Sequence, residues 1–247
     1  MDVWAHRGFS SIYPENTMLA FERAVESGAD GIEMDVHLSS DGCPVVIHDE
    51  SLLRTCGVDK KVGECTLDEL THTVASKTQG GRYNTTIPSF DEFCAFVRET
   101  GTRADVELKT GVVYYPGLEE KVAGVIRKYG IEDRIIFSSF NWLSLVIMKK
   151  ILPSVPCGLL FESHMNARHL SYEAKSCGMD LLHPDFACID DEMVREADEL
   201  GIGINAWTIN SEEELRKLIG WNVKGCITNS PDMCLAVLGR FMRRRGC

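Results

Sequence analysis

Polar and apolar residues alternate through residues 30–37, and this pattern predicts a β-strand. Successive side chains of a strand point to opposite faces, so Glu33 and Asp35 share one face and the apolar residues beside them share the other. Two carboxylates this close repel each other, which raises the pKa of one unless a cation lies between them. A divalent metal ion explains the pair, and a solvated acidic face on an edge strand is the alternative.

Seven further segments have a strand-like pattern, and helical patterns separate them. In the helical segments the apolar residues recur every three to four positions, as at Phe90, Phe93 and Val97. Capping boxes mark three helix starts, at residues 66–69, 89–92 and 211–214. The predicted strands are Val3–His6, Gly31–Val36, Ala104–Leu108, Ile135–Ser138, Gly158–Phe161, Asp180–His183, Gly203–Trp207 and Gly225–Thr228.

Eight strand and helix units in 247 residues are what a (β/α)8 TIM barrel requires. A doubly wound open sheet is the alternative, and we favour the barrel, as a single domain over residues 1–247. The stretch after the second predicted strand departs from this alternation of strands and helices. A turn at Asp41–Gly42 leads into a short strand at 44–47, and one short helix around Leu67–Val74 follows. We therefore expect a hairpin strand and a small insertion, over about 43–88, after the second strand.

Composition narrows the class of protein further. With 44% hydrophobic and 26% charged residues the chain reads as an ordinary soluble globular protein. A net charge of -11 argues against a nucleic acid as partner, because proteins that bind its backbone need a basic surface. None of the ten cysteines forms a Cys-x-x-Cys pair, which argues against structural zinc and fits reduced, buried thiols such as Cys94, Cys157 and Cys226.

The sequence also bears on membranes. It has neither a signal peptide nor an apolar run near the ~18 residues of a membrane span, so we expect a cytoplasmic protein. The arginines of residues 240–245 complement the negative end of a last helix, and alone they would hold a membrane only weakly. We therefore expect no stable membrane anchoring, and no motif indicates an oligomeric state.

Candidate chemistry gathers at the carboxyl ends of the first three predicted barrel strands and of the hairpin strand. In a TIM barrel these ends form one rim, where active sites lie. Glu107 and Lys109 repeat the two-residue spacing of Glu33 and Asp35, so both pairs can face the barrel axis. The residues expected to converge are His6, Arg7, Glu33, Asp35, His48, Glu107 and Lys109.

Eight short motifs contain or flank these residues: Ala5–Gly8, Pro14–Thr17, Gly31–Val36, Asp41–Gly42, Val46–Asp49, Val106–Lys109, Ser138–Phe140 and Trp207–Thr208. In this order they resemble the motif series of the glycerophosphodiester phosphodiesterases, within the phosphatidylinositol-phospholipase-C-like barrel superfamily. The resemblance implies a metal-dependent enzyme that cleaves glycerophosphodiesters, such as glycerophosphocholine or glycerophosphoethanolamine, to glycerol 3-phosphate and an alcohol. It implies Glu33, Asp35 and Glu107 as ligands of one divalent cation, Mg²⁺ or Ca²⁺, and His6 and His48 as an acid/base pair.

The residue chemistry supports these roles independently. A phosphodiester anion repels nucleophiles, so its oxygens need a cation, and the leaving alcohol needs a proton. Two histidines that titrate near neutrality can supply the acid and the base. Arg7 can grip phosphate oxygens with two N–H groups, and Lys109 can add a point charge. Which histidine is the acid stays open, as does the choice between direct hydrolysis and a cyclic phosphate intermediate.

Several neighbouring residues have supporting or alternative roles. Trp207 ends the seventh barrel strand, where it either walls the substrate pocket or packs in the core. We expect Glu15 and Asn16 to support the site or cap a helix, and Asp49 to orient His48 or cap a turn. We expect structural, surface or packing roles for His37, His72, His164, His169 and His183.

Two other functions stay open. A barrel phospholipase or lyase that acts on a lipid headgroup would need an apolar rim or tail, and the sequence pattern indicates neither. A noncatalytic binding relative would have lost acid/base or metal positions, and none of those positions is lost here.

Overall fold

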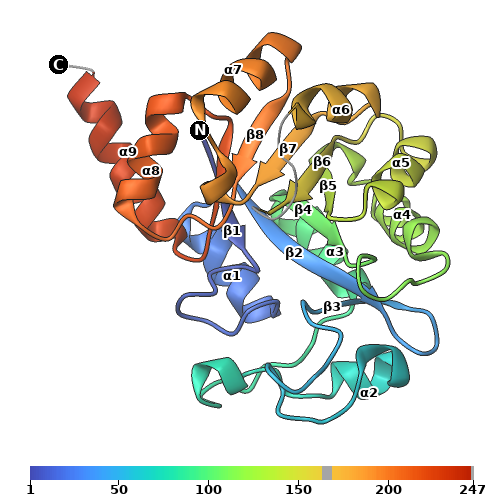
Figure 1. Ribbon diagram of the computed structural model, residues 1–247. Coiled ribbons are helices and arrows are strands. Elements are labelled where there is room, and N and C mark those ends of the chain that lie inside the picture. The colour runs from blue at the N-terminus through green and yellow to red at the C-terminus, as the bar shows by residue number, and fades with distance from the viewer. Residues whose placement is uncertain (163–168, 246–247) are drawn as a thin grey trace.

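The structure is a computed structural model that describes residues 1–162 and 169–245. Its centre is a closed barrel of parallel strands, because β1 pairs with both β9 and β2. The (β/α)8 TIM barrel prediction is therefore confirmed, and the open sheet is excluded (Figure 1). The barrel strands are β1 (Asp2–His6), β2 (Gly31–Leu38), β4 (Arg103–Leu108), β5 (Ile135–Ser139), β6 (Cys157–Phe161), β7 (Leu181–Pro184), β8 (Gly203–Ala206) and β9 (Gly225–Thr228).

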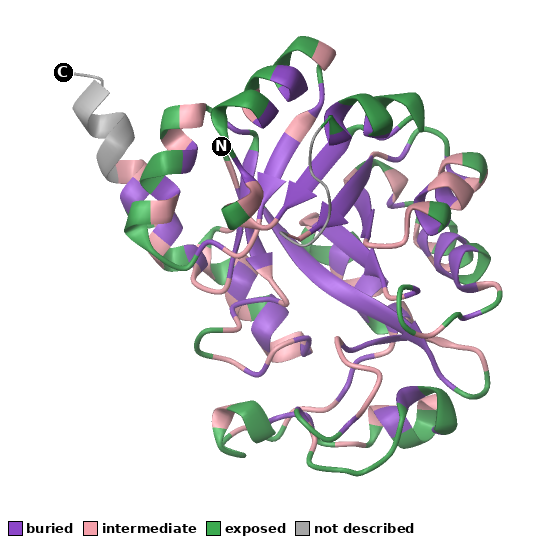
Figure 2. Ribbon diagram, in the orientation of Figure 1, coloured by how far each residue is buried: buried purple, intermediate pink, exposed green. Residues whose placement is uncertain are grey.

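Helices surround this barrel, and their apolar faces cover the outer surface of the strands. Figure 2 shows the strands buried and the outward faces of the helices exposed. Ser211 and Glu214 form the predicted reciprocal capping box, whereas Ser89 only accepts from the Glu92 amide. The helices outside the insertion are α1 (Met18–Ser27), α3 (Phe90–Thr100), α4 (Leu118–Tyr129), α5 (Trp142–Ile151), α6 (Leu170–Ser176), α7 (Asp191–Leu200), α8 (Glu212–Trp221), α9 (Pro231–Arg245) and the short 3₁₀ helices η3 (Glu132–Arg134) and η4 (Phe186–Cys188).

The predicted insertion follows β2 and lies at one side of the barrel (Figure 1). Strand β3 (Pro44–Val46) runs antiparallel to the end of β2. Beyond it come η1 (Val62–Glu64), α2 (Leu67–Thr71) and η2 (Lys77–Gln79), so the helix expected around Leu67–Val74 is three residues shorter. The insertion has a small apolar core of its own, which includes Val45, Ile47, Leu52, Val62, Leu70 and Ile87.

Three further predictions concern the cysteines, membrane spans and the C-terminal arginines. Cys94, Cys157 and Cys226 are buried free thiols, as expected. Over the described ranges, no helix is long and apolar enough to cross a membrane. The side chains of residues 240–245 and His164, whose roles were predicted above, lie outside the described residues.

The barrel interior depends on close approach between one large side chain and one glycine. Trp4 of β1 is 1% exposed and packs with Ile136, Leu181 and Ile227 inside the barrel. The strand register sets Trp4 beside Gly31 of β2, and a Cβ atom at Gly31 would overlap the Trp4 ring. The absence of a side chain at this position therefore lets the tryptophan fill the interior.

We predict that Gly31→Ala destabilises the protein by about 1–3 kcal/mol, because the added methyl group overpacks a rigid interior. Urea unfolding of both proteins measures the difference. Gly124→Ala is the matched control. Gly124 lies in α4, and a Cβ atom added there would have no neighbouring atom within 4 Å. We expect Gly124→Ala to be neutral or stabilising. Equal unfolding midpoints for Gly31→Ala and the parent protein would contradict this account of the interior.

Candidate active site

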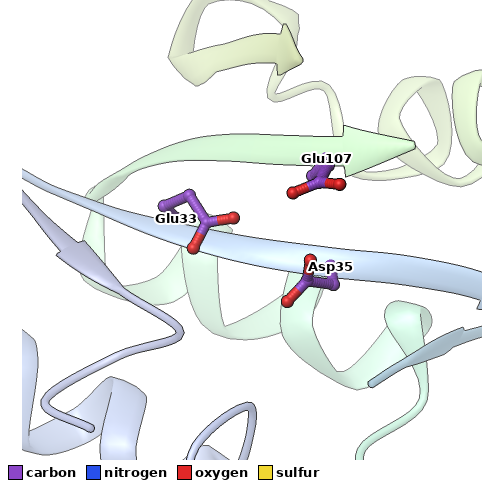
Figure 3. Close-up of side chains that lie close together, drawn as sticks. All are labelled: Glu33, Asp35 and Glu107. Carbon is purple, nitrogen blue, oxygen red and sulfur yellow. The ribbon is translucent and has the colours of Figure 1, made fainter. Parts of the chain in front are cut away.

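Three carboxylates meet at the carboxyl end of the barrel. The parallel register of β2 and β4 sets Asp35 beside Glu107, and Glu33 precedes Asp35 by two residues on the same face. One carboxylate oxygen from each side chain lies within 4.8 Å of the other two. Figure 3 shows the three groups directed toward one another. The convergence expected from the alternation of residues is thus present.

These carboxylates are buried, which makes their charges costly. Burial, and after it the charge of Asp35, raises the pKa of Glu33 well above its ordinary value. Burial also opposes ionisation of Asp35, but the positive charges of His48 and Lys109 outweigh it and lower the pKa of Asp35. Asp35 Oδ1 is buried without a hydrogen-bond partner in the described structure. A set of carboxylate oxygens with an unsatisfied buried member fits a hard divalent cation, which prefers oxygen ligands.

Two basic side chains flank the carboxylates. Lys109 Nζ lies 2.8 Å from Glu107 Oε1 and 3.6 Å from Asp35 Oδ1. Arg7 Nε lies 3.5 Å from Asp35 Oδ2, and Arg7 Nη1 donates to Glu15 Oε1 at 2.8 Å. Both Arg7 and Lys109 also line the pocket. An anion that enters the pocket therefore meets positive groups that are already fixed in place.

Each of the two predicted acid/base histidines has one ring nitrogen held by an oxygen. His6 Nδ1 lies 2.6 Å from Asn229 Oδ1, and His48 Nδ1 lies 2.6 Å from Asp49 Oδ1. The Nε2 atom of each ring is left to exchange a proton, and that of His6 lies 3.9 Å from Glu33 Oε2. Burial is the largest cause that lowers the pKa of His6 to about 4.

A cavity of about 420 Å³ joins these groups to an apolar wall. Its polar residues come mainly from β1, β2 and β4, and its apolar residues mainly from the arc β5 to β9. Trp207 packs edge to face on Phe140, with ring centroids 5.8 Å apart, and also contacts the interior cluster around Trp4. Trp207 therefore lines the pocket and also packs against the barrel interior. The apolar lining is Leu108, Val112, Phe140, Leu160, Trp207 and Ile227.

Comparison with known proteins identifies the class of this site. The model of the glycerophosphoryl diester phosphodiesterase family matches residues 6–233. A glycerophosphodiester phosphodiesterase of Caldanaerobacter subterraneus subsp. tengcongensis is 38% identical over 237 residues, which cover 93% of this chain and 94% of that protein. The chain belongs to the glycerophosphoryl diester phosphodiesterase family.

Further relatives of this phosphodiesterase agree in sequence and in fold. A glycerophosphodiester phosphodiesterase of Bacillus altitudinis is 36% identical over 241 residues, covering 95% of this chain and 97% of that protein. The solved structure of an Oleispira antarctica phosphodiesterase, in complex with the product sn-glycerol-3-phosphate, has a TM-score of 0.85 at 28% identity and covers 97% of both chains. The family resemblance inferred from the motifs is confirmed.

The structure of the phosphodiesterase brings all eight predicted site residues to one rim. Asp35 is fully buried beneath the pocket, beside the other two carboxylates. Seven of the eight line the pocket itself: His6, Arg7, Glu33, His48, Glu107, Lys109 and Trp207.

Two of the remaining histidines are more closely tied to the site than the sequence indicated. His37 is buried, with Nδ1 3.0 Å from the Tyr115 hydroxyl and Nε2 2.9 Å from the His48 carbonyl oxygen, so it braces the backbone of a pocket residue. His183, expected at the surface or in packing, lies inside the barrel and lines the pocket, with Nδ1 3.3 Å from Asp105 Oδ2. Burial lowers the pKa of His183 to about 3 and raises that of Asp105 to about 8. Burial therefore favours the neutral form of both side chains.

The supporting residues expected from the sequence make direct contacts with the site. Asn16 Nδ2 donates to Asp35 Oδ2 at 2.7 Å, and Glu15 accepts from Arg7. Asp49 orients His48, one of the two roles considered for it.

Sequence reasoning missed Arg54, which lies in the insertion. Its guanidinium donates to both oxygens of Asp49, at 2.7 and 2.8 Å, and to both oxygens of Glu15, at 2.7 and 2.8 Å. Asp49 in turn holds His48, and Glu15 holds Arg7. One arginine therefore joins the supports of two pocket residues. Nothing in its sequence context marks it, because its partners are side chains rather than a backbone pattern.

We predict that Arg54→Ala lowers kcat/KM of the phosphodiesterase by about 10- to 100-fold, because both pocket residues lose their orientation. Arg54→Lys should recover little, since an ammonium cannot donate to two carboxylates in a planar fork. Arg23→Ala, which removes an exposed pair with Glu26, is the control and should keep full activity. Thermal unfolding checks that each variant folds. A well-folded Arg54→Ala protein with parental kcat/KM would show that Arg54 positions nothing.

Proposed function

We propose that this protein hydrolyses glycerophosphodiesters, such as glycerophosphocholine or glycerophosphoethanolamine, to glycerol 3-phosphate and an alcohol. The observation that carries the proposal is the convergence of three buried carboxylates, two basic side chains and two histidines on one pocket. A product of this kind, sn-glycerol-3-phosphate, is bound by the related Oleispira antarctica phosphodiesterase.

Glu33, Asp35 and Glu107 would hold one divalent cation, Mg²⁺ or Ca²⁺. When bound, such a cation neutralises phosphate oxygens and makes the phosphorus atom more open to attack. The raised pKa of Glu33 supports this role, because three carboxylates so close together do not all ionise readily by themselves. Lys109, already between Glu107 and Asp35, would contact the same phosphate as a point charge.

The hydrogen-bond partners of the histidines support a different role for each. His48 Nδ1 faces the carboxylate of Asp49, and a carboxylate stabilises an imidazolium ring, so His48 is suited to give a proton to the leaving alcohol. His6 Nδ1 faces the amide oxygen of Asn229, which accepts the Nδ1 proton and leaves Nε2 as a base. His6 would therefore deprotonate the attacking water or glycerol hydroxyl group.

The two remaining groups would bind the substrate at either end of the pocket. Arg7 is held in place by Glu15 and would donate to phosphate oxygens. Trp207 and Phe140 would cover the carbon atoms of the glycerol or alcohol part, since their edge-to-face pair forms the apolar wall. The product would leave as an anion from the same mouth.

We predict that a chelator abolishes release of glycerol 3-phosphate from glycerophosphocholine and that Mg²⁺ or Ca²⁺ restores it. The measurement is an enzyme-coupled assay of glycerol 3-phosphate at fixed ionic strength. The variant Glu107→Gln should need a higher cation concentration for half-maximal rate, because it removes one charged ligand. Activity that is indifferent to chelation would remove the cation from the mechanism.

We predict that His6→Ala and His48→Ala each lower kcat by about 10²–10⁴-fold, the usual contribution of a proton carrier. Single-turnover rates with glycerophosphocholine measure the effect. His72→Ala is the matched control, because this histidine lies on α2's exposed end with its side chain 77% exposed. A loss of tenfold or less would make either histidine a structural residue.

A further inference from the structure

The backbone pairing between β2 and the insertion stops just before one histidine of the pocket. At its end the Ile47 amide donates to the Asp35 carbonyl oxygen at 3.1 Å. His48 follows, and its carbonyl oxygen lies 2.9 Å from a side-chain nitrogen, His37 Nε2. A side chain of β2 thus takes over where the backbone pairing stops, and it holds the backbone that carries His48.

The hydrogen-bond partners of His37 define which of its ring nitrogens carries the hydrogen. A carbonyl oxygen can only accept, so Nε2 donates to it. The other nitrogen, Nδ1, lies 3.0 Å from the Tyr115 hydroxyl. Both partners are uncharged and His37 is fully buried, which favours the neutral ring, so Nδ1 accepts from the hydroxyl. Burial raises the pKa of Tyr115 to about 12, and its hydroxyl therefore keeps the proton that it donates.

Tyr115 is itself fixed in place. It belongs to the loop between β4 and α4, which lines the pocket through residues such as Val112. Its ring packs edge to face on His37, with ring centroids 5.5 Å apart, and the residue is 7% exposed. Closer to β4, the Thr110 hydroxyl of the same loop lies 2.6 Å from the Ser144 hydroxyl in α5. The loop is therefore held at two points, and Tyr115 can act as a rigid support.

We propose that Tyr115 and His37 are positioning residues for the reaction: the Tyr115 hydroxyl fixes the tautomer of His37, and His37 holds the backbone of His48. The inference rests on the proposed function, because both residues act through a histidine of that site. In the described structure neither residue is part of the pocket lining, so their effect reaches the substrate through His48. His48 then has two supports, Asp49 for its ring and His37 for its backbone.

A double-mutant cycle with His48 tests whether Tyr115 acts through that histidine. With glycerophosphocholine and a saturating divalent cation, Tyr115→Phe should lower kcat about tenfold and change KM less than about twofold, because the phosphate-binding groups stay in place. In the His48→Ala background, Tyr115→Phe should lower kcat no further, since no imidazole is left to position. Equal fold losses of kcat in the two backgrounds would overturn the inference.

Two substitutions of His37 separate its hydrogen bond from its packing. A glutamine side chain carries an N–H donor that can reach the same carbonyl oxygen, whereas a leucine fills the space and donates nothing. We expect His37→Gln to keep kcat within about threefold of the parent value and His37→Leu to lower it about tenfold or more. Thermal unfolding checks that both variants fold. Equal kcat values for the two folded variants would show that the hydrogen bond to His48 positions nothing.

NMR of protein labelled with ¹⁵N-histidine gives a readout that does not depend on activity. His37 should show a protonated Nε2 and an unprotonated Nδ1, and Tyr115→Phe should shift the His37 signals but not those of His72. Tyr129→Phe is the matched control, because it removes another hydroxyl, which donates to Asp91 at 2.7 Å from the last residue of α4. This control should keep the parental kcat and His37 signals. A protonated Nδ1 on His37 in the parent protein would overturn the inference.

Failure of the inference and failure of the proposed function give different results. A parent protein that does not hydrolyse glycerophosphocholine overturns the proposed function, and the inference falls with it. A parent protein that hydrolyses glycerophosphocholine, together with a folded Tyr115→Phe variant of equal kcat, overturns the inference alone.

Discussion

Three carboxylates are buried within 4.8 Å of one another on β2 and β4, and their mutual repulsion is the constraint that the rest of the site has to satisfy. A barrel can impose this arrangement because its register is fixed along two long, well-paired strands. The neighbouring groups compensate the three carboxylates unequally. Lys109 contacts Glu107, and Arg7 and Asn16 contact Asp35, while Glu33 responds with a raised pKa. The remaining imbalance is what makes the group receptive to a cation.

A series of ion pairs with alternating charge extends outward from the carboxylates. Asp35 lies beside Arg7, Arg7 is bound to Glu15, and Glu15 is bound to Arg54. Arg54 binds Asp49, whose other contact is His48. This series of ion pairs thus begins at the three carboxylates and ends at His48. Arg54 and His48 both follow β3. The insertion therefore supplies one histidine of the pocket and the arginine that holds it in place through Asp49.

Backbone periodicity accounts for what the sequence could predict. The alternation of residues 30–37 predicted a strand with two carboxylates on one face, and the same two-residue spacing at Glu107 and Lys109 predicted a second strand that joins it. Barrel topology then placed both at one rim. By contrast, Arg54 acts through side-chain contacts between segments 39 residues apart, and the contact of His183 with Asp105 joins β7 to β4 inside the barrel. Neither contact produces a periodic pattern in the sequence.

The two-sided pocket links the fold to the choice of substrate. Most of the charged lining comes from β1, β2, β4 and the insertion, with Glu162 after β6 as an exception, and the apolar wall comes largely from the later strands. The barrel order therefore gives the pocket a mainly charged side and a mainly apolar side. A free phosphate monoester would use only the first side. A diester with carbon on both sides of phosphorus can contact both sides of the pocket. The strand ends thus supply most of the charged groups of the pocket, and the loops after β4 and β5 add Val112 and Phe140 to its apolar wall.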